Sequence, residues 1–154
     1  MNPEIQQVLV HSIGAFGGTL GYAFLLNAPL STVLPASLTG LLGYVLYELL
    51  VVFSSCGMIF SYFLATVIIT VLCEIEARIM RMPSTIFLLT ALVPLVPGYT
   101  FYCAMLAIVE HNGAAFAAYG LEAVQIVAVI AVGAAVTSTF FRALTMRAAK
   151  PKSI

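Results

Sequence analysis

The sequence predicts an all-α polytopic membrane protein with about five transmembrane helices, the fourth of them broken at Pro94–Gly98. Composition is the first observation: 62% of the 154 residues are hydrophobic and 8% are charged, whereas a soluble domain carries roughly 25% charged residues. The second is the spacing of the charges, which leaves long uncharged runs at 5–47, 49–73, 82–109 and 123–141. Because a helix needs about 20 apolar residues to cross the bilayer core, these runs accommodate two, one, one and one spans.

Polar turns set the expected limits of the five segments. The first segment ends at Asn27-Ala28-Pro29, and the third follows a break that begins at Ser54. A charged stretch from Glu74 to Ser84 is expected to connect the third and fourth segments. Glu110-His111-Asn112-Gly113 is expected to close the fourth. The expected spans are 6–26, 30–53, 58–73, 85–109 and 118–141.

The basic residues predict the orientation of the chain. All six Lys and Arg fall in two clusters, Arg78 with Arg81 and the tail 142–154. Cytoplasmic connections carry an excess of Lys and Arg, and five full spans put both clusters on one side. We therefore expect residues 1–154 to form a single transmembrane domain with an external N-terminus and a basic cytoplasmic tail. A fourth segment that only entered and left one face would put the clusters on opposite sides.

Several classes of protein are excluded by what the sequence contains. The net charge is zero and no basic run precedes the tail, so nothing predicts nucleic-acid binding. The chain has no Asp and three scattered cysteines, and it carries no Ser/His/Asp set, HExxH motif or glycine-rich phosphate loop. We therefore expect no enzyme activity, no metal site and no cofactor, and we interpret His11 and His111 as polar residues at the membrane interface.

The fourth segment contains the motif Val93-Pro94-Leu95-Val96-Pro97-Gly98. Two prolines three positions apart remove backbone donors and clash with the preceding turn, so the helix must kink or unwind. In secondary transporters, broken helices of this kind hold substrate near the middle of the membrane. We expect the substrate or translocation site to include Pro94, Pro97 and Gly98, with Tyr99 and Thr100 beside them. A simple packing kink is the alternative.

Glu48 is the one acidic residue well inside an apolar run. A carboxyl group in a membrane helix is costly and usually faces a cavity or a partner. We expect Glu48 to couple transport to a proton by binding and releasing it. The alternative is an interfacial anchor, because only five positions separate Glu48 from Phe53.

Four glycines, Gly14, Gly17, Gly18 and Gly21, share one face of the first expected helix. Their spacing includes two overlapping small-xxx-small pairs, which let helices approach closely. We expect this stripe to support helix packing, either against another helix of the same chain, which we slightly favour, or against another subunit.

The centre of the chain resembles the threonine/serine exporter (ThrE) family, in its small-subunit form. The resemblance covers roughly residues 10–142, and its most specific part comprises Glu76-Ala77-Arg78, Met82-Pro83, Phe87, Val93-Pro94-Leu95-Val96-Pro97-Gly98, Tyr102 and Met105. It implies a bacterial inner-membrane exporter of small polar metabolites, either threonine and serine or dicarboxylates such as succinate. It also implies a larger membrane subunit as partner.

The resemblance therefore favours one half of a heteromeric secondary exporter that works by alternating access in the lipid bilayer. Two other functions stay open at this point. The chain could act as a homodimeric proton-coupled exporter that needs no other subunit, or as a structural membrane subunit that does not itself transport.

Overall fold

The computed structural model describes residues 3–53 and 57–148, and these ranges consist of helices joined by short turns. The predicted turn at Ser54 and the end of the basic tail, with Lys150 and Lys152, lie outside them. The elements are α1 (Pro3–Leu25), α2 (Leu30–Phe53), α3 (Met58–Met80), α4 (Ser84–Ala91), the 3₁₀ turn η1 (Val93–Leu95), α5 (Gly98–Val109) and α6 (Gly113–Ala148). The predicted all-α fold is confirmed.

Four of these helices, α1, α2, α3 and α6, are each long and apolar enough to cross a membrane. The fourth predicted segment is a pair, Ser84–Leu95 and Gly98–Val109, bent by 55° at its break. Counting this pair as one span gives the five predicted spans. The chain is therefore a polytopic membrane protein whose one irregular span lies in the middle of the sequence.

Three of the turns between successive helices have the same backbone conformation. Asn27, Arg81 and His111 adopt left-handed conformations with φ of 56°, 55° and 55°. In each turn the next N–H donates back to a carbonyl five residues earlier, as from Met82 to Ala77 at 3.0 Å. This bond satisfies a carbonyl that the helix end would otherwise leave unpaired. The polar turns predicted from the sequence thus end three helices with hydrogen bonds to their own last turn.

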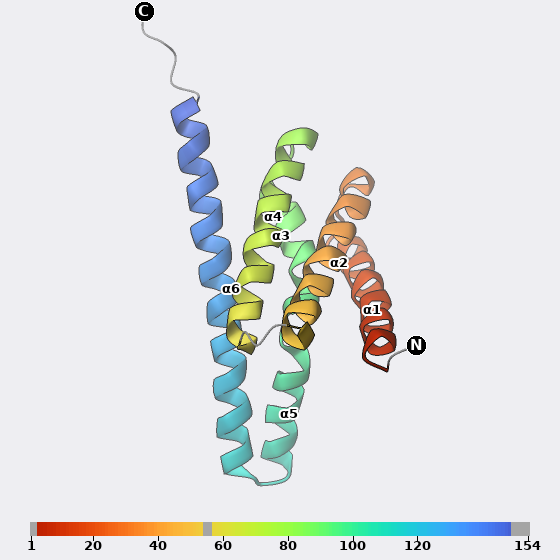
Figure 1. Cartoon of the computed structure of the whole chain (residues 1–154), viewed down its shortest axis with the longest axis vertical. Coiled ribbons are helices and arrows are strands. Elements are labelled where there is room, and N and C mark those ends of the chain that lie inside the picture. Colours follow the sequence, from red (N-terminus) through yellow and green to blue (C-terminus); the bar gives the residue numbers. More distant parts are fainter. Residues whose placement is uncertain (1–2, 54–56, 149–154) are drawn as a thin grey trace, which may run out of the picture.

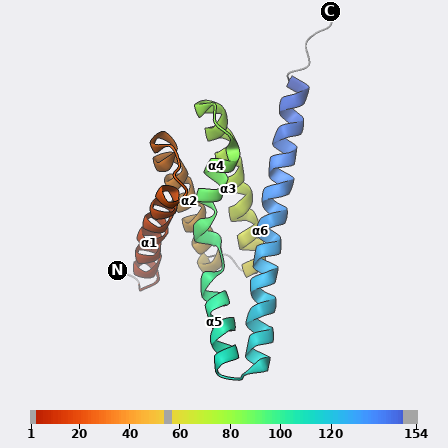
Figure 2. The same ribbon diagram turned by 180° about the vertical axis from the view of Figure 1, so that it is seen from behind.

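The helices form a bundle centred on α2 and α3 (Figure 1). α1 packs against α2, α6 packs against α3, and α4 lies against both central helices. Large buried side chains fill the interior, including Ile69, Phe87, Leu95 and Ile126. Seen from behind, η1 leads from α4 into α5, which pairs with the first half of α6 (Figure 2). The break in the fourth span therefore lies where the bundle passes into this α5–α6 hairpin.

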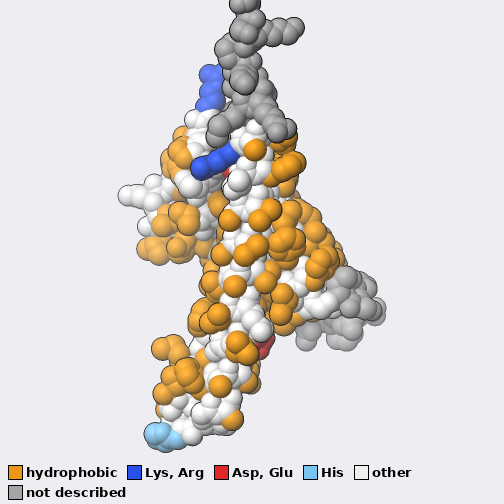
Figure 3. All heavy atoms as spheres, turned by 90° about the vertical axis from the view of Figure 1, so that its left-hand side faces the viewer, with side chains coloured by type: hydrophobic (Ala, Val, Ile, Leu, Met, Phe, Trp, Pro, Cys, Tyr) orange, Lys and Arg blue, Asp and Glu red, His pale blue; other side chains and the backbone are white. Residues whose placement is uncertain are grey.

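The α5–α6 hairpin extends beyond the ends of α2 and α3 that face it (Figures 1 and 2). With 36 residues, α6 is about 54 Å long, much longer than the ~30 Å hydrocarbon core. Hydrophobic side chains are spread along its outward face (Figure 3). On α5, Tyr99, Met105 and Val109 are 79%, 69% and 74% exposed. The hairpin therefore presents an extensive apolar surface.

The third and last helices are longer than predicted. The third helix does not end at Cys73 but continues to Met80, so Glu74 and Glu76 are helical rather than part of a connector. The last helix begins at Gly113 instead of residue 118 and continues beyond residue 141. Ala, Glu, Arg and Met favour helix, and Asn112 caps α6 by accepting a 3.1 Å hydrogen bond from the Ala115 N–H.

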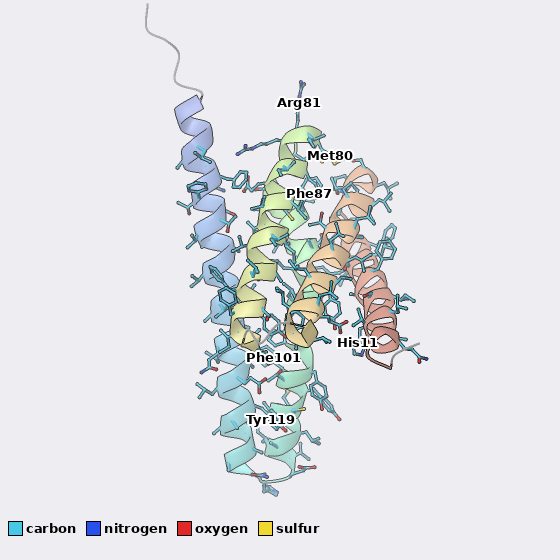
Figure 4. The ribbon with its side chains drawn as sticks, viewed as in Figure 1. His11, Met80, Arg81, Phe87, Phe101 and Tyr119 are labelled. Atoms are coloured by element: carbon cyan, nitrogen blue, oxygen red, sulfur yellow. The ribbon has the colours of Figure 1, made fainter. Side chains whose placement is uncertain are left out.

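The basic residues of α3 and α6 lie at the same end of the bundle. A guanidinium nitrogen of Arg78 donates to the Phe141 carbonyl at 3.3 Å, and Arg78 lies 5.0 Å from the centre of the Phe141 ring. Arg142 follows Phe141 directly in the sequence. Arg81 extends from the same end, far from His11 (Figure 4). This arrangement is the one that five full spans require.

Candidate transport site

The break between α4 and α5 is built from two tight turns. Pro94 lies inside η1, and Val96 is extended with ψ of 128°. Pro97, with φ of −76° and ψ of 60°, lies at the centre of a three-residue turn in which the Gly98 N–H donates to the Val96 carbonyl at 2.7 Å. These angles match an inverse γ-turn. α5 then begins without a side-chain cap, so its positive end is not neutralised by an acceptor side chain.

Glu48 lies in a cluster of polar side chains between α1 and α2. Its Oε1 is 2.7 Å from Nδ1 of His11, and it accepts a 3.1 Å hydrogen bond from the Tyr44 hydroxyl. The side chain of Glu48 is 12% exposed, whereas that of His11 is 56% exposed. The second carboxyl oxygen, Oε2, is buried and has no hydrogen-bond partner. The carboxyl group is therefore held by one oxygen and can accept a further donor at the other.

Two open hollows meet at this cluster. The glutamate hollow has a volume of about 270 Å³ and is lined by Val8, His11, Tyr44, Tyr47, Glu48, Val51 and Val52. The proline hollow has a volume of about 310 Å³ and is lined by Val10, His11, Gly14, Ala15, Tyr44 and Pro94. His11 and Tyr44 line both hollows. The helix break and the membrane carboxyl therefore border neighbouring hollows that share two lining side chains, although 46 positions separate Pro94 from Glu48 in the sequence.

Aromatic side chains support the cluster from the side of α3. The rings of Tyr47 and Tyr62 lie 4.3 Å apart, and those of Tyr44 and Tyr47 lie 6.1 Å apart. Tyr62 is buried, at 8% exposure. Because aromatic rings are rigid and pack at defined distances, these contacts fix the face of α2 that carries Tyr44 and Glu48.

The predicted site residues do not all face this region. Pro94 lines the proline hollow, while Pro97 and Thr100 are buried at the start of α5. Gly98 and Tyr99 are exposed on the outside of the break. The sequence predicts Pro94 and Glu48 as site residues independently of each other. In the structure, His11 and Tyr44 line both hollows and so relate the two residues.

The glycine stripe on α1 does not pack against this chain. A methyl group placed on Gly14, Gly17, Gly18 or Gly21 would meet no atom within 4 Å, so the slightly favoured expectation of packing inside the chain is wrong. The close helix contacts occur elsewhere: a methyl group on Gly43 would overlap the side chain of Ile69. α1 instead contacts α2 through Thr19, which lies against Gly40. The stripe is therefore an open surface with Gly14 at the edge of the proline hollow.

The family model described as threonine/serine exporter, ThrE, matches residues 11–140. The chain belongs to this exporter family. The matched range contains His11, Tyr44, Glu48 and Pro94, and hence the groups that join the two hollows. Neither a curated protein nor a solved structure matches this ThrE chain. As a family member with several spans, it is a membrane transporter protein, which agrees with the sequence-based prediction of an exporter.

Proposed function

We propose that this ThrE chain is the small subunit of a heteromeric secondary exporter of small polar metabolites. Threonine and serine are the first candidate substrates, and dicarboxylates such as succinate are the second. The observation that carries the proposal is the convergence of the helix break and the Glu48 carboxyl at His11 and Tyr44. A kink that served only helix packing would not require a cluster of protonatable side chains beside it.

In this proposal, the break and the cluster perform different tasks. The uncapped start of α5 and the irregular backbone at Pro94–Gly98 offer polar groups to a small zwitterion or anion. Glu48 binds the coupling proton, and His11 and Tyr44 hold the carboxyl in place. The hydrogen bond between Nδ1 of His11 and Oε1 of Glu48 contains one proton, whichever of the two groups holds it. Loss or gain of a proton at this pair therefore changes the hydrogen bond that links α1 to α2.

The site also gives a reason for a second subunit. Both hollows are open, Gly14 of the glycine stripe lines the proline hollow, and α5 carries exposed apolar side chains. Five spans place the two ends of a chain on opposite sides, so a homologous five-span half joined in series would be inverted. Inverted pairs build alternating-access transporters. We therefore propose that a larger ThrE-family subunit completes the substrate site in the bacterial inner membrane, with the N-terminus of this chain outside.

Export from living cells tests this function. Cells loaded with labelled threonine, serine or succinate would express the chain, the larger ThrE-family subunit, or both. We expect faster efflux only when both are present, and we expect the two proteins to copurify. Efflux with the chain alone would favour the homodimeric exporter. Efflux that needs the chain but survives replacement of both Pro94 and Glu48 would favour the structural subunit.

A further inference from the structure

A second membrane carboxyl, Glu76 on α3, has the same unusual environment as Glu48. Its Oε1 accepts a hydrogen bond from the Thr39 hydroxyl on α2. Its Oε2 is buried and has no hydrogen-bond partner. Within residues 3–53 and 57–148, Oε2 of Glu48 and Oε2 of Glu76 are the buried side-chain oxygens left without a partner. Each carboxyl is therefore held through one oxygen, Glu48 by His11 and Tyr44 and Glu76 by Thr39, and leaves the other oxygen unpaired.

Among the side chains that the structure describes, none forms an ion pair with Glu76. The helices that pack against α3 are α2, α4 and α6. The charged residue of α2 is Glu48, and α4 has no charged residue. Arg78 donates to the Phe141 carbonyl on α6, and Arg142 follows Phe141 in the sequence. Helical periodicity puts Arg78 and Glu74 on other faces of α3 than Glu76.

The remaining titratable neighbours of Glu76 are neutral or acidic groups. Cys73, one turn earlier on α3, is fully buried. On α6, the acidic residue is Glu122, whose charge acts on Tyr62 near the start of α3, far along that helix from Glu76. A charge on an unpaired oxygen inside the membrane is unfavourable, and a bound proton removes that charge. The geometry is thus suited to a carboxyl that alternates between a neutral buried form and a charged form reached in another conformation.

The helix break lies between the two carboxyls along α2. Thr39 and Glu48 are nine residues apart, or about 14 Å along the helix axis. A methyl group on Gly40, next to Thr39, would lie 3.1 Å from the carbonyl oxygen of Ala91, the last residue of α4. On the other side of the break, Pro94 borders the hollow that contains His11. A movement of the broken segment would therefore alter the surroundings of both carboxyls.

We propose that Glu76 is a second proton-binding carboxyl of this chain, which handles the coupling proton on the opposite side of the break from Glu48. The inference rests on the proposed function, because it assigns the two ends of one proton path. In each cycle Glu48 binds one proton from one face, that proton passes to Glu76 when the broken segment moves, and Glu76 releases it at the other face. Each carboxyl returns to its starting state, and one positive charge crosses the membrane for each proton.

Infrared spectroscopy of the purified chain in lipid tests the proton on Glu76 without requiring transport. A protonated carboxyl gives a carbonyl band that a carboxylate lacks. We expect Glu76→Gln to remove one such band that titrates between mildly acidic and mildly alkaline pH. Glu74→Gln, two positions away on another face of α3, is the matched control and should leave that band in place. A Glu76→Gln spectrum identical to that of the unchanged chain would overturn the proposal.

Transport by the chain with the larger subunit in liposomes supplies the second readout. Glu76→Gln should abolish accumulation driven by a pH gradient but retain exchange of labelled for unlabelled substrate, because exchange needs no net proton movement. Full pH-driven accumulation by this variant would overturn the proposal. If the unchanged pair moves no substrate, the proposed function fails, and the infrared band still decides the state of Glu76.

If Glu76→Gln does not fold, Thr39→Val tests the same assignment. It keeps the shape of the side chain but removes the hydroxyl that donates to Oε1 of Glu76. We expect the Glu76 carbonyl band to shift in frequency and to remain titratable. A band at its original frequency would contradict the assignment to Glu76.

Discussion

Nδ1 of His11 lies 2.7 Å from Oε1 of Glu48, which ties α1 to α2 across 37 positions of the sequence. This contact gives the membrane carboxyl a hydrogen-bond partner on a second helix. It also separates the glutamate hollow from the proline hollow, since both residues line the first and His11 lines the second. The contact therefore relates the proton-binding group to the broken span.

The first prediction concerns Glu48. Glu48→Gln should leave the chain folded, because Gln keeps the size of the side chain, but it should weaken transport or flatten its pH dependence. The groups that face Glu48 are His11, Tyr44 and Tyr47, and none of them replaces the lost carboxyl. Rates measured from mildly acidic to mildly alkaline pH would check this. An unchanged rate across that range would leave Glu48 as an interfacial anchor.

The second prediction concerns the orientation of the spans. On a cysteine-free chain, single cysteines beside Arg81 and Lys150 should react with a membrane-impermeant reagent from the same side. A cysteine at Asn112 should react from the opposite side. The reason is that five full spans place both basic clusters on the cytoplasmic side. Labelling of the first two positions from opposite sides would mean that the fourth segment enters and leaves one face.

The third prediction separates glycines that pack inside the chain from those that face outward. Gly43→Ala should destabilise the purified chain by about 1–3 kcal/mol, the usual cost of overpacking, because the new methyl group overlaps Ile69. Gly17→Ala should leave its stability unchanged or slightly raised, since that face is open. Thermal unfolding in detergent would check both.

Replacement of Gly17 by the larger Leu gives the corresponding test for the second subunit. It should reduce copurification with the larger ThrE-family subunit while the isolated chain stays folded. Full recovery of the complex would show that the glycine stripe faces lipid instead of the partner.

The fourth prediction concerns the break. Replacing Pro94 and Pro97 together with Ala should stabilise the fourth span, because proline costs ~3 kcal/mol in a helix interior. The same change should abolish transport, since a continuous helix removes the γ-turn at Pro97 and the uncapped start of α5. Efflux assays and thermal unfolding of the double variant would measure the two effects. Full transport by the stabilised variant would reduce the break to a packing kink.

Much of the fold could be predicted from the sequence because the bilayer imposes long apolar runs. The limits of α2, Leu30 and Phe53, agree with the prediction, and Pro29 directly precedes the helix. The end of α3 was missed because Glu74 and Glu76 were interpreted as a connector. In the structure, Glu74 is 7% exposed. The charge of Glu76 alone could not show that its carboxyl group accepts a hydrogen bond from the buried Thr39 hydroxyl.

The candidate site was predictable only in part. Tyr44 could have been found, because residues four apart on a helix meet on one face, and Glu48 follows Tyr44 by four positions. His11 could not, since no local pattern relates a residue of the first helix to one 37 positions later. That the glycine stripe is open could not be predicted either, because small-xxx-small spacing indicates a packing surface but not which helix packs against it.

Reconstitution of the purified chain tests the half-exporter proposal most directly. Liposomes would contain the chain alone, the larger ThrE-family subunit alone, or both, with labelled threonine inside and a pH gradient across the membrane. We predict substrate release only from liposomes that contain both proteins, with either protein alone no faster than empty liposomes. Release at the full rate from liposomes that contain this chain alone would contradict the account.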